Sequence, residues 1–312
     1  MSLKQTFKIS IKSVTIALMV FSIVACSNSS EVATDATISS KGYHSTERIV
    51  STAWVEDNLS KKHVKIIDIR KPEDFDAGHI EGALNYYYKE LQVESNGVAG
   101  LIPDADTISA KLSSLGVESS DTIIIYDHIK NLWASRLLWT LSVYGHDDAR
   151  LMDGSYGLWT QENRSFTTDV SQVKASSYKF GEENLNLITS IDTVLNSLDN
   201  SSSIVLDTRS PDEYSGRDVR ALRGGHIPDA INVEWVHNLD DDGRFLPAED
   251  LAKLYSTANI SKDSEIYTLC QTAVRATHSW FVLSELLGFD NVSVYDGSWT
   301  EWGNIEDTPI ES

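Results

Sequence analysis

The sequence predicts an α/β fold made of two tandem copies of one domain, each a parallel β-sheet with helices on both faces. Two blocks of sequence recur in the same order, and within each copy short β-branched runs alternate with helical stretches. That alternation is typical of strand, crossover helix and parallel strand. Gly145 and Gly288, which lie in the second block, stand 143 residues apart. The matched blocks are 65–85 with 203–232, and 121–159 with 263–302.

Length and composition set the limits on function. The chain has 312 residues, of which 41% are hydrophobic, and this favours folded domains over disorder. A net charge of -20 argues against a nucleic-acid partner, because such a surface repels phosphate backbones. The only cysteines are Cys26 and Cys270, which excludes a disulfide framework and any zinc site built from a CxxC pair. Each cysteine therefore needs its own explanation.

The first 25 residues are predicted to be a signal peptide. Three lysines precede an apolar run from Ser13 to Ala25, which is shorter than the ~20 residues that a membrane-spanning helix needs. The junction 23–26 resembles the lipobox of bacterial lipoproteins, which implies a lipid on Cys26 and membrane attachment through it. Ser27 after the cysteine favours the periplasmic face of the outer membrane within the bacterial cell envelope. The alternative is an ordinary signal peptide with an incidental cysteine.

Composition divides the rest of the chain into four segments. Residues 26–42 are rich in Ser, Thr and Ala and are predicted to form a flexible tether. The first copy spans 43–165, a linker with little periodicity spans 166–186, and the second copy spans 187–312. The copies therefore differ little in length, and their differences in sequence become informative.

The main difference between the copies is at Cys270. The predicted strand Glu265–Leu269 ends at this residue, and a helix is expected from about Ala276 to Leu287. A thiol at this corner faces unpaired backbone N–H groups and the positive end of the helix dipole, and both favour the thiolate. The first copy has Asp127 at the matching position and so has no sulfur nucleophile there. The alternative is an inert buried cysteine.

Around this cysteine the sequence resembles the two-domain rhodaneses, the thiosulfate and 3-mercaptopyruvate sulfurtransferases. The resemblance covers about 47–304 and is carried by the Asp-x-Arg, Gly-His-Ile-Pro and Tyr-Asp-Gly-Ser-Trp-x-Glu-Trp motifs and by a six-residue cysteine loop. It implies rhodanese-like domains, of which 43–165 is inactive and 187–312 is catalytic. It also implies that Cys270 takes sulfur from a small anionic donor, as a persulfide, and passes it to cyanide or a thiol acceptor. No cofactor and no metal are expected.

The loop after the cysteine is expected to cradle the persulfide. Its successive backbone N–H groups form an anion-binding nest. Phosphatases of related fold place an arginine six positions after the cysteine, where this chain has Ala276, so phosphatase or arsenate-reductase activity is disfavoured. If Ala273 needs a positive φ, strain of about 1 kcal/mol is expected there. The predicted cradle residues are Gln271, Thr272, Ala273, Val274 and Arg275.

Arginines are the expected binding groups for the donor, because guanidinium suits small anions. We predict Arg220, which lies in an insertion that the first copy lacks, and Arg275. The sequence departs from the resembled family at Glu213, where a second substrate arginine is usual, and in the loop residues that follow the cysteine. Both departures favour thiosulfate over mercaptopyruvate. A sulfane-sulfur carrier serving a protein partner and a catalytically dead scaffold remain alternatives.

Other motifs are interpreted as structural. His79 and His226 occupy matching positions in both copies, and so do the pairs Asp68–Arg70 and Asp207–Arg209, so hydrogen bonding is favoured over catalysis. The stretch 238–249 imitates an EF-hand loop, but it lacks a second EF-hand and contains a proline, so calcium binding is disfavoured and left open.

Overall fold

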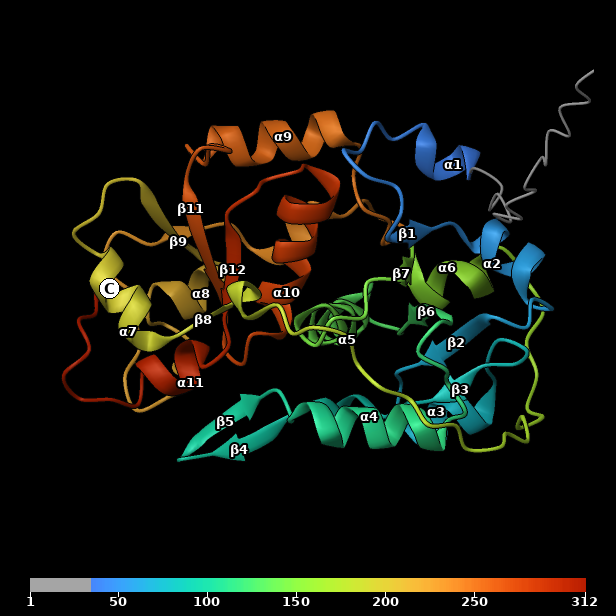
Figure 1. Cartoon of the computed structure of the whole chain (residues 1–312). Coiled ribbons are helices and arrows are strands. Elements are labelled where there is room, and N and C mark those ends of the chain that lie inside the picture. Colours follow the sequence, from blue (N-terminus) through green and yellow to red (C-terminus); the bar gives the residue numbers. More distant parts are fainter. Residues whose placement is uncertain (1–34) are drawn as a thin grey trace, which may run out of the picture. The chain divides into compact units, whose positions relative to one another are not determined.

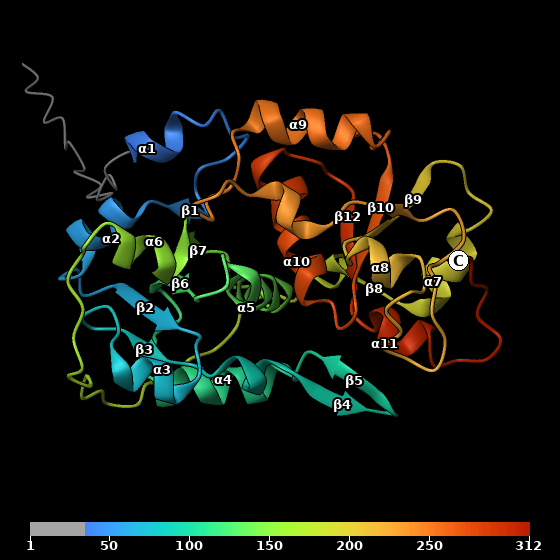
Figure 2. The same ribbon diagram turned by 180° about the vertical axis from the view of Figure 1, so that it is seen from behind.

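The computed structural model describes residues 35–312, which form one compact unit (Figures 1 and 2). The predicted signal peptide and the lipid site at Cys26 lie outside the described residues. Within the described part of the chain, no helix combines the length and apolarity needed to cross a membrane.

The first copy is a five-stranded parallel sheet with strand order β1-β7-β6-β2-β3 and a separate hairpin, β4–β5. β2 and β6 lie at its centre, where β-branched residues fill both faces. Its elements are β1 (Ile49–Val50), α2 (Thr52–Asn58), β2 (Val64–Asp68), α3 (Pro72–Ala77), β3 (Leu84–Asn85), η1 (Tyr88–Leu91), β4 (Val93–Ser95), β5 (Val98–Leu101), α4 (Ala105–Ser114), β6 (Thr122–Tyr126), α5 (Leu132–Val143), β7 (Ala149–Met152) and α6 (Ser155–Gln161).

The second copy repeats this topology. Its strand order, β10-β9-β11-β12-β8, has the equivalent strands in the same positions, and every neighbouring pair is parallel. The predicted duplication and fold class are confirmed. Its elements are η2 (Leu185–Leu187), β8 (Ile188–Thr189), α7 (Ile191–Ser197), β9 (Ser203–Asp207), α8 (Pro211–Tyr214), β10 (Ile231–Asn232), η3 (Trp235–Asn238), α9 (Ala248–Thr257), β11 (Glu265–Leu269), α10 (Val274–Phe281), a π-helical turn η4 (Val282–Leu286), β12 (Val292–Tyr295) and α11 (Ser298–Trp302).

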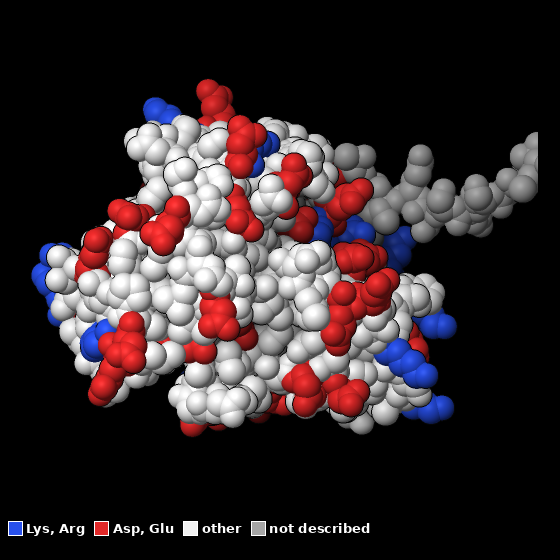
Figure 3. All heavy atoms as spheres, turned by 60° about the vertical axis from the view of Figure 1, so that its left-hand side comes forward, with Lys and Arg blue, Asp and Glu red and all other residues white. Residues whose placement is uncertain are grey.

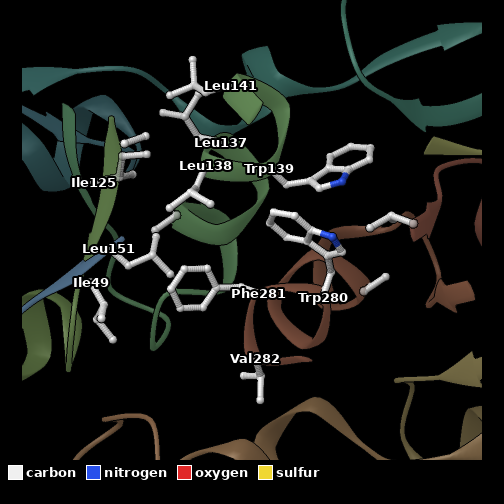
Figure 4. Packing of buried hydrophobic residues seen from close by; sticks show 14 of the residues in the cluster. Ile49, Ile125, Leu137, Leu138, Trp139, Leu141, Leu151, Trp280, Phe281 and Val282 are labelled. Carbon is white, nitrogen blue, oxygen red and sulfur yellow. The ribbon is translucent and has the colours of Figure 1, made fainter. Parts of the chain in front are cut away.

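Helices cover both faces of each sheet, because successive strand residues point to opposite sides. In β6, Ile123 and Ile125 join the core cluster that holds α4 and α5, whereas Ile124 joins the cluster that holds α2, α3 and α6. The first of these clusters continues without a break into the second copy through α10 (Figure 4). The inner helices α5 and α10 therefore join the two copies through one shared hydrophobic core, which includes Trp139 and Trp280.

Matching residues of the two copies also exchange the same polar contact. The Asp153 carboxylate accepts a hydrogen bond from the backbone N–H of Phe245 (2.9 Å), and the Asp296 carboxylate accepts one from that of Ile102 (3.0 Å). Both aspartates stand in the repeated Asp-Gly motif. Each also has a cation, since Arg136 lies 2.6 Å from Asp296, and Lys41 lies 2.8 Å from Asp153. The interface is thus close to twofold symmetric in its contacts.

The segment before the first strand differs from the predicted flexible tether. Helix α1 (Ala36–Ser39) is capped by the side chain of Asp35, and Ile38 is fully buried in the shared core. The Lys41 ammonium, besides contacting Asp153, donates to the carbonyl of Phe245 (2.5 Å). Residues 35–42 therefore pack against the fold. Although their composition is polar, the buried isoleucine and the paired lysine attach them to it. The rest of the predicted tether lies outside the described residues.

Candidate functional site

Cys270 directly follows β11 and precedes α10, and its residue is only 1% exposed. Its backbone N–H donates to the Ser298 hydroxyl (3.2 Å), and its carbonyl accepts from the N–H of Trp299 (3.0 Å). The start of α11 therefore holds the backbone of the cysteine. It is a free thiol.

The loop from Cys270 to α10 is short and strained at one residue. Ala273 has φ +59°, which is the left-handed conformation, and it is completely buried. The helix begins at Val274, two residues earlier than predicted, so that Arg275 lies in its first turn. The predicted cradle residues thus form a short loop that passes from the cysteine directly into a helix N-terminus.

The first copy shows what such a loop does with an anion. The Asp127 carboxylate stands in the place of the cysteine, and it accepts four backbone N–H groups of its loop and helix, at 2.8–3.2 Å. The donors are Ile129, Asn131, Trp133 and Ala134. In this copy the nest is filled by a carboxylate that belongs to the protein itself.

The two loops differ in length by one residue. The left-handed residue before the helix is Asn131 in the first copy, four positions after Asp127, but Ala273 in the second, three positions after Cys270. The π-helical turn Val282–Leu286 adds one residue back, because a π turn is one residue wider than an α turn. This restores the 143-residue spacing at Gly145 and Gly288. The larger loop encloses a carboxylate, and the smaller one begins at the cysteine.

Arg275 is held beside Cys270 by a buried carboxylate. Its guanidinium makes two hydrogen bonds to Glu213, at 2.5 and 2.8 Å. Burial works to lower the pKa of Arg275, but the carboxylate and the nearby Cys270 sulfur outweigh it and raise the pKa. For the acid Glu213, burial works in the opposite direction and would raise the pKa. Its hydrogen bonds with Arg275 and the charge of that arginine nevertheless lower the pKa to about 2. This ion pair is therefore a charged, fixed part of the site.

Arg220, the other predicted binding arginine, lies at the rim. Its side chain is 50% exposed, and it pairs with Asp218 at 2.6 Å and approaches Glu213 at 3.3 Å. Its carbonyl accepts a hydrogen bond from the side chain of Gln271 in the cysteine loop (3.0 Å). Both predicted arginines thus reach the same carboxylate, Glu213. Acidic side chains are spread over the face shown in Figure 3, and at the site itself the two arginines pair with Asp218 and Glu213.

The first copy contributes to the site through its β4–β5 hairpin. Gly100, with φ +91°, approaches the cysteine loop so closely that a Cβ there would lie 2.7 Å from the Cβ of Thr272. The side chain of Gln92 reaches the carbonyl of Thr272 (3.5 Å), and the Thr300 hydroxyl reaches the carbonyl of Ala99 (3.1 Å). The hairpin of the first copy therefore supports the cysteine loop of the second copy.

The reverse contact is also present. Gly243, with φ +79°, lies in the second copy at the position of Gly100 and approaches Lys130 in the loop that follows Asp127. A Cβ on Gly243 would lie 2.9 Å from the Cγ of Lys130. Each copy thus supports the other's loop with a matching glycine.

Sequence reasoning missed three contributors: Glu213 as the partner of Arg275, Ser298 under the cysteine backbone, and the hairpin. In the sequence, Glu213 stands out only as a departure from the resembled family. Spacing gives no signal for a contact between residues 62 positions apart. The repeated glycine, by contrast, was visible as Gly100 and Gly243 at the spacing of the duplication.

The motifs interpreted as structural make matching contacts in both copies. Arg70 and Arg209 each make paired hydrogen bonds to the aspartate two residues before them. The Nδ1–H of His79 donates to the carbonyl of Phe75 (2.8 Å), and that of His226 donates to the carbonyl of Tyr214 (2.9 Å). These residues hold the strand ends and take no part in the charge cluster at Cys270.

In the stretch 238–249, which imitates an EF-hand loop, acidic side chains make hydrogen bonds within the protein. The Asp240 carboxylate accepts the backbone N–H of Arg244 (2.9 Å), and Asp242 accepts from the side chain of Gln161 (3.2 Å). Over residues 35–312 no cluster of three or more histidine, cysteine or acidic side chains is arranged to hold a metal ion. The structure therefore adds no support for calcium binding.

Comparison with known proteins gives consistent results. The family model of the rhodanese-like domain matches residues 51–162 and 190–305. The chain is 35% identical to the thiosulfate sulfurtransferase of Corynebacterium glutamicum, over 86% of this chain and 92% of that protein. It is 35% identical to the sulfur carrier protein TtuD of Thermus thermophilus, over 86% and 98%. Among solved structures, YnjE matches with a TM-score of 0.75 at 22% identity, over 85% and 68%, which concerns the fold alone.

Proposed function

The chain belongs to the rhodanese-like family, of which it carries two domains, and we propose that it transfers sulfane sulfur from thiosulfate, or a related donor, through a persulfide on Cys270. The acceptor is cyanide or a thiol. The relatives named thiosulfate sulfurtransferase support a sulfurtransferase. The second copy is the catalytic one, because the first has a carboxylate at the nucleophile position.

The observation that carries this proposal is the internal comparison of the two loops. In the first copy four backbone N–H groups point at the anion Asp127. In the second copy a cysteine stands at the same corner, beside Arg275. Backbone N–H groups and a guanidinium placed around one sulfur stabilise both a thiolate and the charge of a persulfide.

The reaction balances without an external oxidant. The Cys270 thiolate attacks the outer sulfur of thiosulfate, a new S–S bond forms, and sulfite leaves with the electron pair of the broken S–S bond. The carbon of cyanide then attacks the terminal sulfur of the persulfide. Thiocyanate forms, and the Cys270 thiolate leaves with the electron pair. A covalent intermediate of this kind predicts ping-pong kinetics.

The test uses the chain from Ser27 onward, without Cys26. The protein is incubated with thiosulfate, and its mass is measured before and after cyanide is added, while thiocyanate is followed. We expect a gain of one sulfur atom on Cys270 that cyanide removes, and neither effect in Cys270→Ser. Thiocyanate formation that survives in a folded Cys270→Ser protein contradicts the proposal.

A carrier function is the second candidate, and the sulfur carrier protein of Thermus thermophilus among the relatives favours it. In this case the same persulfide would form but would be delivered to a protein partner. Loading of Cys270 with negligible turnover on cyanide and small thiols would distinguish a carrier from an enzyme. A donor panel that includes mercaptopyruvate identifies the donor in either case.

We also propose that the protein is attached to the bacterial envelope through lipid on Cys26. The support is the lipobox-like sequence 23–26 after a basic and apolar segment. Labelling of cells with a radioactive fatty acid should mark the wild-type protein and not Cys26→Ser. An unlabelled wild-type protein would contradict the proposal.

A further inference from the structure

The charges around Cys270 are organised by one buried acid. The side chain of Glu213 is 1% exposed, and both predicted binding arginines approach it, Arg275 at 2.5 Å and Arg220 at 3.3 Å. Arg275 lies in the first turn of α10, directly after the loop that begins at Cys270, and the nearby sulfur contributes to raising the pKa of its guanidinium. Since Glu213 makes both contacts, it links the rim arginine to the arginine at the nucleophile.

Glu213 is itself held in place by the N-cap residue of its own helix. It forms a capping box with Ser210 at the start of α8, in which its carboxylate accepts the backbone N–H of Ser210 (3.2 Å) and its own N–H donates to the Ser210 hydroxyl (3.3 Å). The carboxylate therefore has little freedom, and the guanidinium bound to it is held in one place.

The first copy provides an internal control. Its third residue of the matching helix is Asp74, which pairs with Lys71 at 3.6 Å near the surface, and Trp133 stands where the second copy has Arg275. The copy that lacks the nucleophile thus also lacks the buried carboxylate–arginine pair. By contrast, the structural Asp-x-Arg pairs are present in both copies. The Glu213–Arg275 pair is therefore found only in the copy that carries the cysteine.

On the basis of the proposed sulfur transfer, we propose that Glu213 is a positioning residue that holds Arg275 at the Cys270 sulfur and limits the positive charge offered to the donor. Its carboxylate offsets the charge of Arg275, while Asp218 pairs with Arg220 at the rim. The site therefore accommodates a dianionic donor less readily than two free arginines would. Glu213 thus acts on both the transfer step and the choice of donor.

The experiment compares three variants in the enzyme from Ser27 onward. Glu213→Gln keeps the capping box, since glutamine fits it, but removes the charge. Glu213→Asp keeps the charge and shortens its reach. Asp212→Asn is the matched control, because it removes the same charge at the neighbouring residue of α8, whose side chain is exposed and pairs with Arg217. The donors are thiosulfate, a dianion, and an alkanethiosulfonate, a monoanion that transfers sulfur in the same way.

We expect kcat with thiosulfate to fall roughly tenfold or more in Glu213→Gln, because Arg275 is no longer held by a charge. The KM for thiosulfate should fall relative to the KM for the thiosulfonate, because a negative charge facing the dianion is removed. Glu213→Asp should lose kcat without this change in the ratio of KM values, and Asp212→Asn should match the wild type. If Glu213 had only a structural role, the rates with both donors would fall by the same factor, which would equal the loss of folded protein.

The proposal is overturned if folded Glu213→Gln keeps both constants for both donors within about twofold of the wild type. The rate of Cys270 alkylation by iodoacetamide separates this failure from that of the sulfur transfer itself. An altered rate in Glu213→Gln, with the wild-type rate in Asp212→Asn, supports the positioning of Arg275 even if wild-type protein turns over neither donor. Equal alkylation rates in all three proteins count against it.

Discussion

Asp127 in the first copy occupies the position that Cys270 occupies in the second, and four backbone N–H groups point at its carboxylate. The duplicated loop has therefore kept its affinity for negative charge in a copy that has no nucleophile. A carboxylate satisfies the N–H groups that would otherwise be buried without partners. This relationship makes several properties of the protein testable.

Replacing Asp127 should destabilise the protein without changing the chemistry at Cys270. Asp127→Ala leaves four backbone N–H groups without their acceptor, which should cost about 3 kcal/mol of the free energy of unfolding. Urea unfolding measures the loss, and the free energy of unfolding of Asp127→Asn should lie between those of the wild type and Asp127→Ala. The kcat of the folded variant should stay near the wild-type value. A loss below about 1 kcal/mol would show that the cradle does not depend on this anion.

The two matching glycines should separate support of the active loop from general stability. Gly100→Ala places a Cβ 2.7 Å from that of Thr272, so the cysteine loop must shift, and kcat should fall roughly tenfold to a hundredfold. Gly243→Ala has nearly the same strained φ but meets only Lys130 in the loop without a nucleophile. It should lose similar stability and keep its kcat. An equal loss of kcat in both variants is the contrary result.

The stabilisation from Glu213 should depend on pH. The pKa of its carboxyl is lowered from 4.5 to about 2, because Arg275 outweighs the effect of burial. The folded state then favours the ionised form by about 3 kcal/mol above pH 4.5, and this is lost as the pH falls from 4.5 towards 2. Urea unfolding of wild type and Glu213→Gln across this range should show a difference that shrinks with acid. A difference independent of pH would contradict the assignment.

His278 should make the fold sensitive to mild acid. It is fully buried on α10 between Phe245 and Trp235, and burial lowers its pKa from 6.5 to about 3. The unfolded chain therefore takes up a proton below pH 6.5 that the folded chain refuses, and stability falls by about 3 kcal/mol between about pH 7 and pH 4. His278→Leu should remove this part of the loss. An unchanged pH profile in the variant would count against the buried neutral histidine.

The fold and the nucleophile could be predicted from the sequence because both depend on local patterns. The repeat gave the duplication, and the strand ending at Cys270 gave the corner in front of a helix. The partner of Arg275 could not be found, because Glu213 is distant in sequence and its meaning depends on the folded backbone. The packing of residues 35–42 was missed for a related reason. A single buried side chain, Ile38, outweighs a polar composition that resembles a linker.

The reciprocal contacts of Asp153 with Phe245 and of Asp296 with Ile102 have the form of an isologous interface, in which two partners offer each other the same surface. Such an interface belongs to a twofold homodimer. Here both partners are parts of one polypeptide, so their association is intramolecular and independent of protein concentration. One half therefore need not carry a thiol, since it is always present as the partner of the half that has one.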